Sequence, residues 1–144
     1  MAALSDYLEN KIIDWLLRGQ AYTPPATVYI GLSTTATADD SFGTEPSGNG
    51  YARVAIASSL ANWAGTQGAG TTSVSNGTGG QTSNNIAVNF PTPSGSWGNC
   101  THWFVADAAS GGNLLIHNAL VATTNIQSGD TVAFANGALT LTIG

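Results

Sequence analysis

The chain has 144 residues, and only 8% of them are charged, against about 25% in a typical soluble domain. This length fits one domain with one apolar core. The net charge of −5 leaves no cluster of cations to bind phosphates, which argues against nucleic-acid binding and against a polybasic membrane tether. A surface with so few charges favours a subunit whose faces are covered by neighbours.

The pattern of residues 6–18 predicts the one long helix, which lies within an N-terminal segment of residues 1–20. Ser5 is placed to cap this helix and Gly19 to end it. Two interpretations of its apolar stripe stay open: the stripe packs on the chain's own sheet, or it docks on a neighbouring subunit. The stripe, and therefore the candidate interface, consists of Leu8, Ile12, Trp15 and Leu16, and Ile13 and Leu17 widen its apolar side.

After Pro24 and Pro25 the apolar residues recur with a period of two, which is typical of β-strands. Strands are expected at residues 28–32, 53–57, 86–90, 101–106, 113–120, 131–135 and 139–143, with a weaker one at 60–63. Ser110-Gly111-Gly112 marks a turn, and Asn136-Gly137 favours a two-residue hairpin. These signals predict an all-β fold: a single β-sandwich or jelly-roll-like domain over residues 21–144, preceded by one N-terminal amphipathic α-helix.

Two segments, residues 34–50 and 65–85, are expected to form long polar loops. Asp39, Asp40 and Glu45 in the first segment do not match the spacing of a calcium loop, so solvated carboxylates are expected there. The second segment is nearly free of apolar residues. It is expected either to order against a neighbour or to fold into strands too polar to recognise.

Residues for catalysis are few. His102 and His117 are the candidate bases, and Asp107 and Asp130 are the acids that could support them beside a serine. No Gly-x-Ser-x-Gly motif singles out that serine, and a strand histidine beside aromatic residues is usually part of the packing. Cys100 is the one cysteine of the sequence, so an internal disulfide is excluded. A structural zinc site needs four ligands, and no second cysteine is present to supply one. We therefore expect no catalytic residue, no metal and no cofactor.

Four tryptophans raise the possibility of a sugar-binding platform. They are Trp15, Trp63, Trp97 and Trp103. Packing in the core or at an interface is the favoured role, because large rings dominate the energetics of burial.

The N-terminus shows no secretory signal and no stretch approaches the ~18 apolar residues of a membrane span, so assembly in the host bacterial cytoplasm is expected. Several motifs resemble a family of short tailed-phage and prophage proteins usually labelled phage tail fibre proteins. They lie at residues 4–11, 18–19, 22–29, 50–54, 89–91, 97–98, 112–115 and 129–130. Residues 102–107 depart from the usual form, which has a smaller residue after the histidine. The resemblance implies a virion component with no catalytic signature.

Within that class, an exterior capsid decoration or cement protein is the first expectation, because the chain has neither the repeats nor the heptads of a fibre shaft. A tail-fibre or tail-tip component involved in host attachment comes second, a carbohydrate-binding module third and an enzyme last. The expected partners are the major capsid protein or other virion proteins and further copies in a dimer or trimer. A host-surface glycan is kept as a further partner, and neither nucleic acid nor a membrane is expected.

Overall fold

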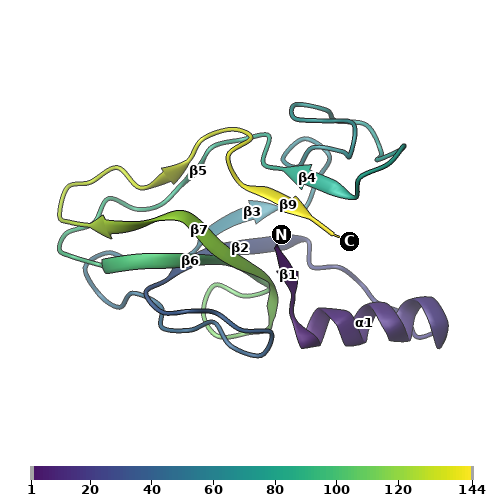
Figure 1. Ribbon diagram of the computed structural model, residues 1–144, viewed down its shortest axis with the longest axis horizontal. Coiled ribbons are helices and arrows are strands. Elements are labelled where there is room, and N and C mark those ends of the chain that lie inside the picture. Colours follow the sequence, from purple (N-terminus) through teal and green to yellow (C-terminus); the bar gives the residue numbers. More distant parts are fainter. Residues whose placement is uncertain (1, 144) are drawn as a thin grey trace.

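The computed structural model describes residues 2–143, in which one five-stranded antiparallel sheet has the strand order β1-β7-β6-β2-β3. Two short ribbons, β4–β9 and β5–β8, lie above this sheet in the view of Figure 1. The strands are β1 (Ala3–Leu4), β2 (Thr27–Ser33), β3 (Val54–Ala57), β4 (Gln81–Ser83), β5 (Val88–Asn89), β6 (Gly98–Ala106), β7 (Leu114–Ile126), β8 (Ala133–Phe134) and β9 (Thr140–Thr142). With α1 (Asp6–Leu17) as the one helix of the described residues, the prediction of an all-β fold with a single N-terminal helix is confirmed.

The main core lies between the five-stranded sheet and the two ribbons. Alternating side chains of β2, Ile30 and Leu32, point into it and are buried together with Val88 of β5 and Leu141 of β9. The period-two pattern that predicted these strands is therefore the pattern of the face that the ribbons cover.

Loops, and not strands, cover the other face of the sheet. Phe104 of β6 is fully buried there and packs edge-on against Phe42, with 4.9 Å between the ring centroids. A Cβ atom on the facing Gly31 would come within 2.2 Å of the Phe104 ring, so this strand position requires glycine. The segment of residues 34–50 is thus part of the fold's packing.

One buried cation holds the covering loops in place. Arg53 has 2% of its side chain exposed and is bound to both carboxylate oxygens of Glu45, at 2.7 and 3.0 Å. Its Nη1 also donates to the carbonyls of Ala108 and Gly111. The expectation that Glu45 is solvated is wrong, because a buried guanidinium requires a charged partner and Glu45 supplies it.

The predicted hairpin at Asn136-Gly137 is also wrong. Strand β8 pairs with β5 and β9 pairs with β4, so the turn carries the chain from one ribbon to the other. The reason is the buried Asn84. Its amide nitrogen donates to the carbonyl of Ala135 (2.8 Å), and its amide oxygen accepts from the N–H of Leu139 (2.9 Å). These bonds tie both sides of the turn to Asn84, while the turn itself is closed by a bond from the Ala138 N–H to the Ala135 carbonyl (3.0 Å).

The segment of residues 65–85 contains the short polar strand β4 at its C-terminal end, which agrees with the alternative of strands too polar to recognise for that part of the segment. The rest is held by side-chain hydrogen bonds: Asn85 donates to the Thr71 carbonyl and accepts from the Gly70 N–H, both at 2.9 Å. The weak strand expected at residues 60–63 is a turn with one isolated bridge, from Trp63 to Asn84. Side-chain hydrogen bonds of Asn85, Thr71 and Gln67, together with backbone turns, therefore take the place of a strand ladder in this part of the chain.

Strand β7 is longer than expected and contains a pronounced bulge. Its pairing with β6 advances by five residues, from Ala119 to Thr124, while β6 advances by two, from His102 to Cys100. The side chain of Val121, within the bulge, is fully exposed. Beyond the two residues of β7 that β1 pairs with, this edge of the sheet carries no further strand among the described residues.

Candidate interaction surface

Helix α1 has the two ends that its sequence predicts. The Ser5 hydroxyl oxygen accepts from the Leu8 N–H (3.2 Å), and the Ser5 N–H donates to the Leu115 carbonyl of β7 (2.9 Å). At the other end, Gly19 has φ = 68° and the Gln20 N–H returns to the Asp14 carbonyl (3.0 Å). The first turn is therefore fixed to the sheet, and a left-handed glycine ends the helix.

The structure divides the predicted stripe into two parts. Leu8 and Ile12 are half-buried, and Leu8 packs against the main core. Trp15 and Leu16 are exposed, because the second half of α1 projects beyond the sheet (Figure 1). The first turns of α1 therefore pack on the chain's own body, and the apolar side chains of the last turns are left exposed by the residues that the structure describes.

Ile13 and Leu17, which the sequence places beside the stripe, are exposed as well. The exposed fractions are 49% for Ile13, 58% for Trp15, 65% for Leu16 and 76% for Leu17, and these four residues are here named the helix-end patch. At 100° per residue they cover about 200° of the helix circumference. The remaining side holds Asp14 and Arg18, which form an ion pair of 2.7 Å. The breadth of apolar residues noted in the sequence was the available signal for this patch.

A small apolar cavity opens between the sheet and the β4–β9 ribbon. It has a volume of about 140 Å³ and is here named the end hollow. Its lining residues are Val28, Ser58, Trp63, Thr82, Val105, Ile116 and Leu141. Ile116 pairs with Leu4 of β1, the residue directly before the Ser5 cap. The hollow and α1 therefore belong to the same end of the molecule.

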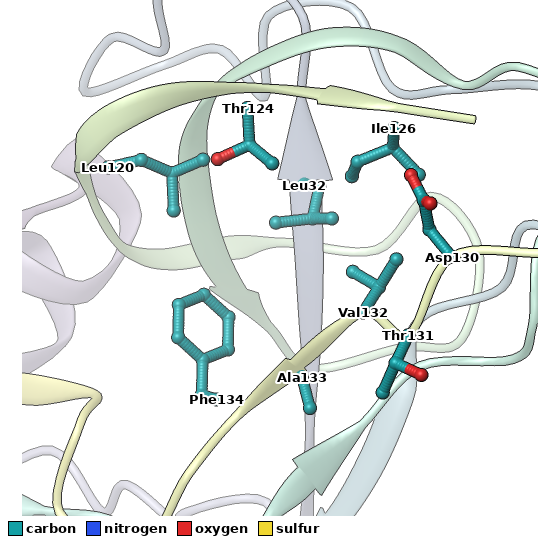
Figure 2. A pocket seen from close by; sticks show the side chains of 9 residues that line it. All are labelled: Leu32, Leu120, Thr124, Ile126, Asp130, Thr131, Val132, Ala133 and Phe134. Atoms are coloured by element: carbon teal, nitrogen blue, oxygen red, sulfur yellow. The ribbon is translucent and has the colours of Figure 1, made fainter.

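A larger and more polar cavity, of about 260 Å³, lies beside the bulge of β7 (Figure 2). Leu32, Leu120 and the ring of Phe134 form apolar walls, while the carboxylate of Asp130 and the hydroxyl of Thr124 contribute polar atoms. One Asp130 oxygen already accepts from the Gln127 N–H (2.8 Å). No histidine, serine or cysteine is among its lining residues.

The histidines do not meet the carboxylates that the sequence offered. His117 is buried, with Nδ1 2.8 Å from the Thr37 hydroxyl and Nε2 3.1 Å from Asp39 Oδ1. This arrangement ties the segment of residues 34–44 to β7. Asp107 instead accepts from the backbone N–H and side-chain amide of Asn113, both at 2.7 Å, and Asp130 binds Gln127.

The second histidine is also engaged. His102 Nδ1 lies 2.8 Å from the Thr101 hydroxyl. Burial, and secondarily the neighbouring His117, lower the pKa of His102. Neither histidine is placed beside Asp107 or Asp130, so the combinations considered for catalysis are not assembled.

The cysteine and the other tryptophans belong to the packing. Burial raises the pKa of the Cys100 thiol to about 11, which leaves it protonated at neutral pH. Trp97 and Trp103 are buried, and Trp63 lines the end hollow. Within residues 2–143 no three His, Cys, Asp or Glu side chains gather in a way that could hold a metal ion. No helix of that range is long and apolar enough to cross a membrane.

Comparison with known proteins identifies the family to which this chain belongs. The family model described as "Podophage GP4 fiber I protein gp80" matches residues 3–142, from the first residue of β1 to the last of β9. The chain belongs to this family. Membership in the fiber I family makes it a phage fibre-type virion protein with a structural role, and the match includes both the helix and the sheet. No match is found among curated proteins.

Proposed function

We propose that this fiber I family protein is a non-enzymatic subunit on the outside of the virion, and that it decorates the capsid by protein–protein contacts. The observation that carries the proposal is the helix-end patch, in which four large apolar side chains stay exposed on one short helix. A 12-residue helix is marginal in water by itself, so a neighbour that covers the last turns also stabilises them.

The area of the patch fits a contact that is repeated many times in a particle. The four exposed fractions amount to roughly 500 Å² at about 200 Å² for each large side chain. Burying this area contributes about 12 kcal/mol as an upper estimate. Association costs about 4–15 kcal/mol, so a single patch roughly offsets the cost of binding, and further contacts in a lattice add to it.

The non-enzymatic part of the proposal rests on how the reactive groups are used. His117 binds Thr37 and Asp39 in the packing of a loop, and the thiol of Cys100 is fully buried. The larger cavity offers a single carboxylate, Asp130, among apolar and hydroxyl side chains. General acid–base or nucleophilic catalysis requires groups within hydrogen-bond reach of each other and of a substrate site.

A second candidate function is a tail-fibre component involved in host attachment. It is favoured by the description of the matching family, which is a fiber protein. Both candidates require protein–protein contacts, and they differ in the part of the particle to which the protein binds.

The test uses particles that lack the protein, separated into capsids and tails. Purified protein is expected to bind the capsids and to raise their resistance to heat. The double variant Leu16→Ser/Leu17→Ser should lose binding, whereas Val121→Ser, which removes an exposed apolar side chain on β7, should bind normally. Binding to tails alone would replace capsid decoration by the second candidate. A turnover abolished by His117→Ala or His102→Ala would refute the non-enzymatic role.

A further inference from the structure

Asn-Gly pairs occur at residues 49–50, 76–77 and 136–137 of the sequence. In such a pair the backbone nitrogen of the glycine attacks the asparagine side chain readily, because glycine has no Cβ to obstruct the approach. The three pairs share this chemistry and differ in how the fold holds them. We propose that Asn76 is a site of spontaneous deamidation in the folded protein, and that the structure protects the other two pairs.

The reaction consumes only water. The Gly77 nitrogen attacks the side-chain carbonyl carbon, Cγ, of Asn76 and gives its proton to solvent, so that an N–Cγ bond forms. The Cγ–Nδ2 bond then breaks and ammonia leaves, which closes a cyclic imide. Water opens this ring at either of its carbonyls and gives aspartate or isoaspartate at position 76. Nothing is oxidised or reduced.

Asn76 and Gly77 lie in the loop that precedes β4 and projects from the molecule beside it (Figure 1). Both residues are exposed, and a Cβ added to Gly77 would meet no atom within 4 Å. Within residues 2–143, no hydrogen bond holds the Asn76 amide or the Gly77 N–H. The adjacent Ser75 is anchored, since its hydroxyl accepts from the Thr66 N–H (3.1 Å). The side chain and the attacking nitrogen can therefore approach each other without breaking a bond.

Asn49 is held through its side chain and its backbone. Its Nδ2 donates to the Ser96 carbonyl at 2.9 Å. Its carbonyl accepts from the Ser94 N–H (3.0 Å) and from Nε1 of Trp97 (2.9 Å). The side chain also packs closely on Gly95, where an added Cβ would come within 2.7 Å of Cγ. Turning Cγ toward the next backbone nitrogen would break these contacts.

At Asn136-Gly137 the attacking nitrogen is already engaged. The Gly137 N–H donates to the Asn84 carbonyl at 2.7 Å, and the buried Asn84 amide binds the backbone on both sides of the turn. The Asn136 side chain is exposed, as that of Asn76 is. Exposure is therefore common to both sites, and the hydrogen bond of the glycine nitrogen is what distinguishes them.

The product changes the charge of a neutral part of the chain. Residues 54–106 contain no Asp, Glu, Lys or Arg, and the new carboxylate adds one negative charge to a chain whose net charge is −5. In the isoaspartate form the main chain is also longer by one methylene, which an exposed loop accommodates. The modification goes beyond the proposed function and involves no residue of the helix-end patch.

Incubation of the purified full-length protein in mildly alkaline buffer tests the proposal. Anion-exchange chromatography should show a more acidic form that increases with time, and peptide mass mapping should place the exchange of amide for acid at Asn76. Asn49 and Asn136 are internal controls and should react about tenfold more slowly, because each must first break a hydrogen bond. In concentrated denaturant the three pairs should react at similar rates, because the fold no longer protects two of them.

Two variants check the chemistry. Asn76→Gln should remain a single charge form, because attack on its longer side chain closes a larger and less favoured ring. Asn136→Gln is the matched control and should age as the wild type does, with the circular dichroism of both variants unchanged. The proposal is overturned if Asn76 stays intact in the folded protein, or if Asn49 or Asn136 reacts there as fast as Asn76.

Discussion

The two faces of the five-stranded sheet are covered by different means. On the ribbon face, apolar side chains of β2, β5 and β9 pack together without charged groups. On the loop face, the apolar contacts are fewer, and one ion pair between Arg53 and Glu45 fixes two loops at once. The comparison teaches that strands cover a sheet mainly by apolar area, whereas irregular segments need a charged pair to hold them in place.

The loop face should therefore react most strongly to a change of charge. Arg53→Met keeps the unbranched apolar stem of the side chain but leaves Glu45 without its cation and two carbonyls without a donor. We expect a loss of about 3 kcal/mol in the free energy of unfolding, measured by urea denaturation. Arg53→Lys should recover only part of it, because an ammonium group cannot bind both carboxylate oxygens and both carbonyls in the same geometry. A loss of under about 1 kcal/mol for Arg53→Met would contradict the comparison.

The next effect concerns space on the same face. Gly31→Ala places a methyl group against the Phe104 ring, which is fully buried and cannot move away. The expected loss is about 2 kcal/mol by the same measurement, as for an overpacked core. Gly19→Ala is the control: its Cβ contacts nothing, and its positive φ costs about 1 kcal/mol. Equal losses in both variants would show that the loop face yields to the extra atom.

The ribbon face should tolerate small changes of volume. Ile30→Val removes one methylene from a fully buried position, and a loss of about 1 kcal/mol is expected. The slope of the denaturation curve should stay that of the wild type, because the unfolded surface is the same. If Ile30→Val lowers the free energy of unfolding more than Arg53→Met does, the expectation that the loop face is the more sensitive of the two is wrong.

The smallest effect is a dependence on pH. Because the pKa of His102 is lower in the folded protein than the usual 6.5, the unfolded chain binds more protons as the pH falls. The stability contributed by neutral His102 is present above pH 6.5 and is lost as the pH falls through the folded pKa. His102→Gln should reduce the difference in thermal stability between pH 7.5 and pH 5.5. His117→Asn should raise the pKa of His102 in an NMR titration, since His117 is one cause of the shift.

Local signals in the sequence were sufficient for the helix and for the strands of the ribbon face. Ser5 and Gly19 define the ends of α1, and Ile30 and Leu32 alternate as a half-buried strand should. The loop face could not be predicted, because Arg53 and Glu45 show no spacing that identifies them as a buried pair. Asn84 is similar: nothing in its neighbourhood indicates that its amide is buried and binds the backbone on both sides of Asn136-Gly137.

The candidate surface was predicted in part. The helical spacing identifies an apolar side of α1, but it cannot show where the body of the protein ends beneath the helix. For this reason Leu8 and Ile12 were grouped with Trp15 and Leu16, although the structure divides them between packing and exposure. The end hollow brings together residues from position 28 to position 141, a separation beyond the reach of any sequence pattern.

The bulge in β7 has a consequence for solubility. An edge strand with unpaired backbone groups and no charged side chain normally recruits a second copy and starts an aggregate. Between Ala119 and Thr124 the extra residues of β7 break the flat ladder, and the projecting Val121 keeps another strand from lying against it. In a protein this poor in charge, the longest strand therefore carries its own obstacle to the edge-to-edge pairing that starts amyloid-like fibrils.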